Sequence, residues 1–125
     1  MPVEPGLAAS VELTVADVDT AAAMSTGDVP VIATPRIVAL AEEASVQAID
    51  GHLADGSTSV GMRIQLDHLA PTAVGGRVVA EAKLDKVEGR RLCFSVSIDD
   101  ERGLVAAGRI TRVVVERERF LDRSH

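Results

Sequence analysis

Aromatic residues are almost absent from this chain, whose 125 residues include two Phe, no Tyr and no Trp. Such a sequence cannot provide the row of aromatic side chains on which single-stranded nucleic acids stack their bases. Positive charge is also in short supply, and the net charge at pH 7 is −6. This balance argues against non-specific binding to nucleic acid or to an anionic membrane, because both require a basic surface.

Cysteine is equally scarce. The single residue Cys93 cannot form an internal disulfide, and no group of cysteines has metal-ligand spacing. The N-terminus lacks a basic segment followed by an apolar run, and no apolar run approaches the length of a membrane span. We therefore expect a soluble, cytoplasmic protein without a bound metal or cofactor.

The residues that are present predict one long helix, from Thr34 to about Asp50. Thr34 suits the N-cap position and Pro35 suits the first helical position, where its missing N–H costs nothing. Gly51 follows the expected end, where glycine is favoured. Between these signals one apolar stripe recurs at helical spacing, formed by Ile37, Leu40, Ala41, Ala44 and Ala48.

The rest of the chain mostly alternates between apolar and polar residues, which predicts five strands. These strands cover residues 7–18, 58–69, 77–87, 90–99 and 104–115. Short connections predict that consecutive strands are antiparallel neighbours. The last strand is apolar on both faces, which favours a central or interface position. Residues 116–125 are charged and are expected to fray.

This order of elements predicts an α+β fold with one helix on a five-stranded antiparallel sheet. We expect a flexible N-terminus over residues 1–6, one domain over 7–120 and a flexible tail over 121–125. A helix is only about 10–12 Å wide, so a single helix leaves part of the sheet uncovered. The sequence therefore predicts a homodimer or a higher homo-oligomer, in which a second copy covers the remainder.

Four positions carry possible chemistry, and each also has a purely structural interpretation. His68 ends an apolar strand face, where a histidine is either a rim residue or a general base. Gly61 weakens its strand, which indicates a bulge or the close approach of a ligand. Thr34 is a helix cap or a reactive hydroxyl. Glu42 is a solvated carboxylate or a site residue, with Glu43 as its fallback.

These residues also carry a resemblance. The chain contains ATPRIVALAEEAS, then VGMRIQLDHLAP and an EGR hairpin, and in this it resembles the fluoroacetyl-CoA thioesterase family of hotdog proteins. The resemblance implies the hotdog fold, with one long central helix packed on the sheet. It also implies hydrolysis of a small acyl-CoA thioester at a dimer interface, with Thr34, Glu42 and His68 as catalytic residues. Gly61 and Arg36 would then contact the substrate, the latter through the phosphates of coenzyme A.

Two questions stay open at this point. His68 can activate either the Thr34 hydroxyl or a water molecule, with Glu42 orienting it or positioning the water. The segment 19–33 contains no aromatic residue, whereas fluoroacetate-specific members carry Phe before the catalytic Thr, so the acyl group is left undefined. The alternatives are a non-catalytic acyl-CoA-binding or regulatory protein and a hotdog hydratase or dehydratase.

Overall fold

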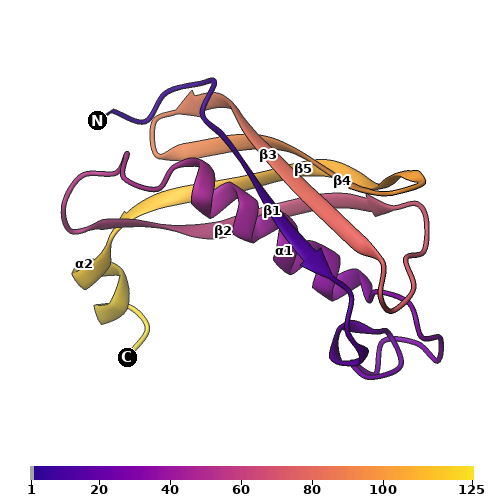
Figure 1. Ribbon diagram of the computed structural model, residues 1–125. Coiled ribbons are helices and arrows are strands. Elements are labelled where there is room, and N and C mark those ends of the chain that lie inside the picture. Colours follow the sequence, from indigo (N-terminus) through magenta and orange to yellow (C-terminus); the bar gives the residue numbers. More distant parts are fainter. Residues whose placement is uncertain (1) are drawn as a thin grey trace.

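The computed structural model describes residues 2–125 and consists of one long helix laid across one face of a five-stranded sheet (Figure 1). The strands are β1 (Ala8–Thr14), β2 (Ser57–His68), β3 (Arg77–Glu88), β4 (Arg91–Asp100) and β5 (Gly103–Glu116). The long helix is α1 (Thr34–Ala48), and a single 3-10 turn, η1 (Asp17–Asp19), precedes it. The predicted flexible N-terminus begins with Met1, which lies outside the described residues.

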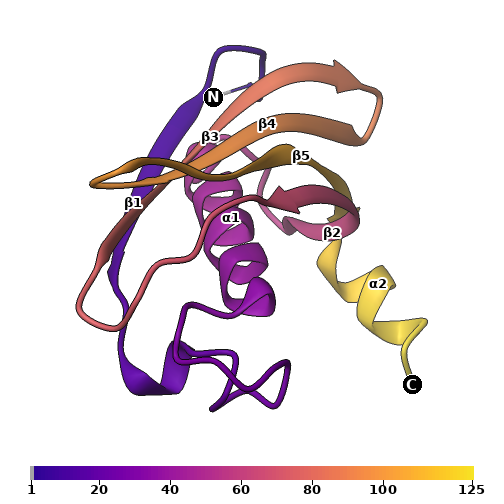
Figure 2. The ribbon, with the colours of Figure 1, turned by 90° about the vertical axis from the view of Figure 1, so that its right-hand side faces the viewer.

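The sheet is antiparallel throughout, in the order β1-β3-β4-β5-β2. The expectation that consecutive strands are neighbours is therefore wrong for β2 and β3. Residues 69–76 carry the chain from the edge strand β2 past β5 and β4 to β3 (Figure 2). β5 lies between β4 and β2, which agrees with its two apolar faces.

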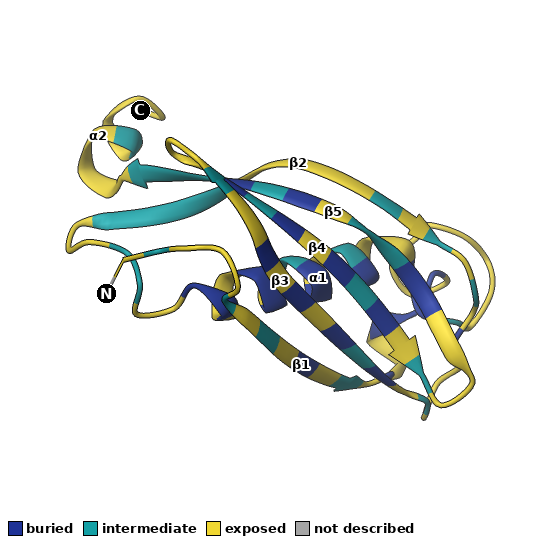
Figure 3. Cartoon of the chain, turned by 90° about the horizontal axis from the view of Figure 1, so that it is seen from above, coloured by how far each residue is buried: buried dark blue, intermediate teal, exposed yellow. Residues whose placement is uncertain are grey.

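The core lies between α1 and the sheet. All five residues of the predicted helical stripe are buried, and burying one large member such as Leu40 contributes about 1.5–3 kcal/mol. The three alanines of the stripe let the helix approach the sheet closely. Burial alternates along β3 and β4, whereas β2 is largely exposed or half-buried (Figure 3).

The start of α1 differs from the sequence prediction. Ala33, not Thr34, occupies the N-cap position, and no side chain caps the helix. Thr34 is the first helical residue, and Pro35 lies in the first turn as expected. The N–H of Arg36 and that of Ile37 both reach the carbonyl of Ala33. The Thr34 hydroxyl is consequently free to bind elsewhere.

A β-bulge interrupts β2. Gly61 pairs with Arg112 of β5, but Arg63 pairs with Thr111, so Met62 has no partner across the ladder. An extra residue of this kind reverses the alternation of side chains beyond it. The predicted continuous face through Val60, Met62, Ile64 and Leu66 is therefore wrong in its first half.

The bulge decides which side chains face the helix. Residues paired directly across a ladder share a face. Gly61 shares the face of Arg112, which contacts α1. His68 shares the face of Ala106, which is buried on the same side of the sheet. Strict alternation places the odd-numbered Gly61 and the even-numbered His68 on opposite faces, but the bulge brings both to the helix side.

The chain continues into a short helix, α2 (Arg117–Asp122), which the sequence did not predict. The Arg117 N–H donates to the carbonyl of Gly56, at a distance of 2.9 Å. This bond fixes α2 beside the start of β2, outside the layer of α1 (Figures 1 and 2). Within residues 2–125, none of the helices has the length and apolar character needed to cross a membrane.

Candidate active site

Thr34 and His68 are in direct contact. The Thr34 Oγ1 lies 2.8 Å from the His68 Nδ1, because the first residue of α1 meets the last residue of β2. Thr34 is exposed and His68 is half-buried. The Nε2 of the same ring is buried and has no hydrogen-bond partner within residues 2–125. A hydroxyl and an imidazole at this separation can act as nucleophile and base.

Glu42 and Gly61 form a second close contact, farther along the helix. A Cβ added to Gly61 would lie 2.6 Å from the Glu42 Oε2. Any side chain at position 61 would displace the Glu42 carboxylate, which explains why a glycine occupies the middle of this strand. Glu42 is partly exposed at the surface of the helix, whereas the neighbouring Glu43 is exposed and forms no ion pair within residues 2–125.

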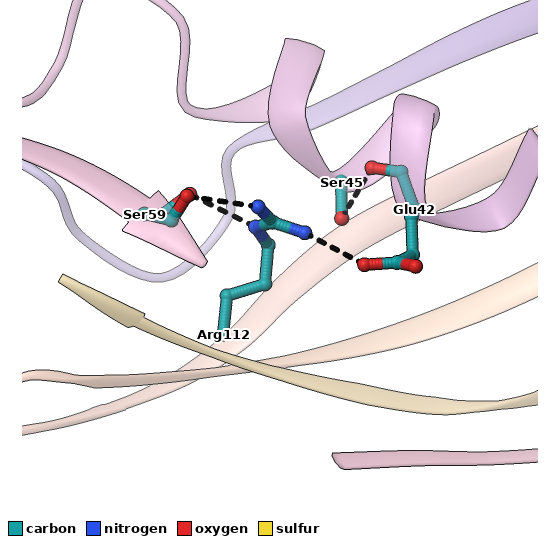
Figure 4. Close-up of polar contacts among 4 residues, drawn as sticks. All are labelled: Glu42, Ser45, Ser59 and Arg112. Atoms are coloured by element: carbon teal, nitrogen blue, oxygen red, sulfur yellow. Dashed lines mark hydrogen bonds and ion pairs between the residues drawn. The ribbon is translucent and has the colours of Figure 1, made fainter. Parts of the chain in front are cut away.

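Arg112 of β5 holds the Glu42 carboxylate (Figure 4). Its Nη1 lies 3.1 Å from the Glu42 Oε2, and its Nε and Nη2 donate to the hydroxyl and the carbonyl of Ser59 at 2.9 and 3.0 Å. The Ser45 hydroxyl donates to the carbonyl of Glu42, 2.6 Å away, which reinforces the helix at this point. The carboxylate is therefore positioned from three elements.

The Arg112 guanidinium is almost completely buried, with 6% of its residue surface exposed. Burial lowers its pKa from the ordinary value, and the charge of Glu42 opposes that shift. Because a buried charge is stable only when it is paired and hydrogen-bonded, Glu42 and Ser59 are needed to keep Arg112 in place. Sequence reasoning missed Arg112. β5 also contains other polar residues, so the signal that could have marked Arg112 is its phase with the apolar Ala106 and Ile110.

Arg36 forms a different contact from the one expected. Its Nε lies 3.0 Å from the Asp19 Oδ1, and the other oxygen of Asp19 accepts the Ala16 N–H at 2.8 Å. Asp19 is buried, so this ion pair fastens the segment before the helix to its first turn. The prediction that Arg36 contacts substrate stays a prediction.

The predicted site residues thus form two pairs rather than one cluster. Glu42 lies eight positions after Thr34, which is about 12 Å along the helix axis. Within the described chain no hydrogen bond or ion pair joins Glu42 to Thr34 or to His68. An open hollow of about 200 Å³ lies beside the first pair, and it is lined by Val31, His68, Leu69, Ala70 and Pro71.

Metal ligands do not gather at either pair. Among residues 2–125, no group of three or more His, Cys, Asp or Glu side chains is placed to hold a metal ion. The chemistry available from this chain is that of a hydroxyl, an imidazole, a carboxylate and the free N–H of a helix start. Those groups suit acyl transfer, in which an oxyanion must be stabilised.

A five-stranded antiparallel sheet wrapped around one long central helix is the architecture of a hotdog protein. Comparison with solved structures agrees with this class. A fluoroacetyl-CoA thioesterase superposes with a TM-score of 0.92 at 30% identity, over 99% of this chain and 96% of that one. A thioesterase superfamily member from Thermus thermophilus gives 0.90 at 30% identity, over 98% and 90% of the two chains.

The chain belongs to the fluoroacetyl-CoA-specific thioesterase family, whose model matches residues 15–118. Among characterised relatives, the fluoroacetyl-CoA thioesterase of Streptantibioticus cattleyicolor is 39% identical over 90 residues. That match covers 72% of this chain and 65% of the relative. The family resemblance and the hotdog fold predicted from the sequence are both confirmed.

Proposed function

We propose that this protein hydrolyses a small acyl-CoA thioester, with Thr34, His68 and Glu42 as its catalytic residues. The observation that carries the proposal is the 2.8 Å contact between the Thr34 hydroxyl and the His68 ring, in a member of a thioesterase family. To accept a hydrogen bond from the hydroxyl at Nδ1, the neutral ring must carry its own proton on Nε2. Thr34 Oγ1 attacks the thioester carbonyl as Nδ1 takes its proton, and the protonated ring gives that proton to the leaving thiolate. A water molecule activated by the same ring then cleaves the acyl-Thr34 ester, which releases the free acid and restores the hydroxyl.

The helix start suits the oxyanion of that step. The Thr34 N–H belongs to the first turn, Pro35 has no N–H, and no side chain caps the helix. A free backbone N–H at the positive end of the helix dipole stabilises developing negative charge. Gly61 and Arg36 lie within this substrate region in the proposal, Gly61 beside Glu42 and Arg36 in the first helical turn.

The proposal includes a homodimer formed through β2. This strand has 12 residues, lies at an edge of the sheet and exposes Met62, Ile64 and the adjoining Leu69. A long apolar edge strand is a template for pairing with another chain. Two copies related by a two-fold axis pair these strands antiparallel, and the two sheets become one.

Dimerisation through β2 also unites the two pairs of site residues. Antiparallel pairing sets the end of one β2 beside the start and middle of the other. His68 then faces the region of Gly61 and Glu42 of the partner subunit. The buried Nε2 of His68 has no hydrogen-bond partner among residues 2–125 of its own chain, and a carboxylate from the second chain is the acceptor that its proton needs. Each site is thus shared between two subunits.

Release of free thiol from a panel of short acyl-CoA thioesters tests the activity. Turnover of at least one member is expected, and product mass separates hydrolysis from hydration. Binding without thiol release would favour the alternative of an acyl-CoA-binding protein. Quenched reactions analysed by intact-protein mass spectrometry are expected to show an acyl group on Thr34 when its removal is slow. Absence of that adduct with every substrate would assign the attack to water.

Mixing two inactive variants tests the shared site. Thr34→Ala and Glu42→Ala each disable both sites of a homodimer. In a mixed dimer, however, one site combines the intact Thr34 of one subunit with the intact Glu42 of the other. Random exchange is expected to restore about a quarter of wild-type activity, because half of the dimers are mixed and each has one intact site. A site contained within one chain would give no recovery.

The single Cys93 fits a reducing compartment, where disulfides are rare. We therefore extend the proposal to a cytoplasmic location, which fractionation of the producing cells tests directly.

A further inference from the structure

Three arginines gather around one of the two phenylalanines of the chain. A hollow of about 80 Å³ lies between the turn after β3, the end of β5 and α2. It is lined by Arg90, Val115, Glu116, Arg119, Phe120 and Arg123, and we call it the arginine hollow. It lies away from the Thr34–His68 pair of its own chain, at the opposite end of β2.

The charges in the arginine hollow are unbalanced. Glu116 is its one acidic residue, and the distance from the Arg119 Nη2 to the Glu116 Oε2 is 3.8 Å in an exposed pair. Neither Arg90 nor Arg123 forms an ion pair within the described residues 2–125. Arg119 and Arg123 stand one helical turn apart, where like charges repel. An anion bound between them would relieve this repulsion.

Phe120 adds a feature that a simple anion does not need. The other phenylalanine, Phe94, is buried in the core at 1% exposure, whereas Phe120 is half-buried and lines the arginine hollow. Guanidinium groups bind phosphates through paired N–H donors, and aromatic faces stack nucleobases. Together these side chains suit a phosphorylated nucleotide.

The proposed dimer places this hollow near a catalytic pair. Glu116 pairs with Ser57 at the start of β2, and the Arg117 N–H bonds to Gly56. Figures 1 and 2 show α2 beside that end of β2. Antiparallel pairing of two β2 strands sets this end next to the end of the other strand, where His68 of the partner subunit lies.

We propose that the arginine hollow binds the phosphorylated nucleotide end of the acyl-CoA substrate, while the acyl group occupies the site that contains Thr34 of the partner subunit. This inference rests on the proposed function. A larger hollow, of about 320 Å³, lies at the other end of the sheet. Its two arginines, Arg77 and Arg102, are balanced by Asp100 and Glu101, and Arg77 is already paired with Glu12. That hollow lacks the excess positive charge that phosphates need.

The test compares two double variants that remove the same charge. Arg119→Ala/Arg123→Ala changes the arginine hollow, and alanine preserves the helix. Arg77→Ala/Arg102→Ala changes the larger hollow and is the control. Calorimetry measures the dissociation constant of CoA, and kinetics compare one acyl group carried by CoA and by pantetheine, which lacks the nucleotide.

About tenfold weaker binding is expected for each arginine lost, since charge-assisted bonds to phosphate are the strong ones. The first double variant is therefore expected to raise the Kd of CoA and the KM of the CoA thioester about a hundredfold, with kcat unchanged. Its kinetics with the pantetheine thioester should match wild type. Adenosine 3′,5′-bisphosphate should compete with CoA for the wild-type protein.

Several results would overturn the inference. These are unchanged CoA binding in the first variant, an equal loss in the control, an equal loss with the pantetheine thioester, or no CoA binding by wild type. Competition by inorganic phosphate as effective as that by the bisphosphate would reduce the hollow to a general anion site. Failure of the proposed function is a separate result, because a wild-type protein that hydrolyses no thioester still yields the calorimetric comparison.

Discussion

Gly61→Ala is the most direct probe of how the carboxylate of the site is held. The added methyl would lie 2.6 Å from the Glu42 Oε2, a separation too short for these atoms, so the carboxylate must move. Its contact with the Arg112 Nη1, now 3.1 Å, is then lost or stretched. The Arg112 guanidinium remains buried and keeps only its two bonds to Ser59.

The magnitude follows from two opposing effects. Replacing a strand glycine by alanine ordinarily gains about 0.5–1 kcal/mol, because glycine loses more conformational freedom on folding. Loss of a hydrogen bond between charged groups costs about 1.5–3 kcal/mol. We therefore expect Gly61→Ala to destabilise the protein by about 0.5–2.5 kcal/mol and to abolish thioester hydrolysis.

A double-mutant cycle with Glu42→Ala isolates the cause. Once the carboxylate is absent, a methyl at position 61 has room, and Gly61→Ala should be neutral or slightly stabilising. Urea unfolding of the four proteins gives the coupling between the two positions, and thiol release gives their activities. If Gly61→Ala destabilises equally with and without Glu42, backbone strain rather than the carboxylate explains the glycine, and the reasoning is refuted.

Three further predictions concern the catalytic pair and the loop beyond it. His68→Ala should lower kcat by about 10²–10⁴-fold in a variant whose circular dichroism and unfolding midpoint match wild type. Thr34→Ala should abolish turnover at little cost in stability, because Thr34 does not cap α1, whereas Thr34→Ser should retain activity; a less stable but fully active Thr34→Ala would refute the catalytic role. Hydrogen bonds from the backbone N–H of Arg102 and, to a smaller extent, from the hydroxyl of Thr72 lower the pKa of Asp100. The ionised carboxylate therefore stabilises the fold above the unfolded pKa of about 3.9. This contribution is lost as the pH falls through the lower pKa of the folded state. The stability difference between wild type and Thr72→Val, measured by urea unfolding, should therefore be larger at pH 6 than at pH 3, and an equal difference would contradict this assignment.

Periodicity was enough to predict the helix and most of the sheet. The helical stripe is buried as expected, and the strands end within a few residues of their predicted bounds, because apolar alternation reports directly which side meets the core. Strand order was less accessible. The sequence of residues 69–76 does not indicate that this loop passes β5 and β4, because a loop of that length can also join neighbouring strands.

The site residues show a similar division. The resemblance pointed to Thr34, Glu42, Gly61 and His68, and the structure brings them together in two pairs; their catalytic roles stay predictions. Gly61 indicated a bulge as one of two interpretations, and the pairing with β5 places one directly after it, at Met62. The effect of this bulge on the facing of His68 depends on the register against β5 and not on β2 alone. Arg112 escaped for the same reason, since its partners Glu42 and Ser59 are distant in sequence and meet it only in the folded chain.

The ion pair of Arg112 also has a consequence for the order in which the protein folds. Its contacts join positions 70 and 53 residues apart, and the Thr34–His68 contact spans 34. Contacts between distant positions form late, because the intervening chain must first be closed into a loop. A refolding chain therefore acquires α1 and the β3–β4 hairpin before it can neutralise the buried guanidinium. During refolding, catalytic activity should return after secondary structure, once the last long-range contacts have closed and the two subunits that share each proposed site have associated.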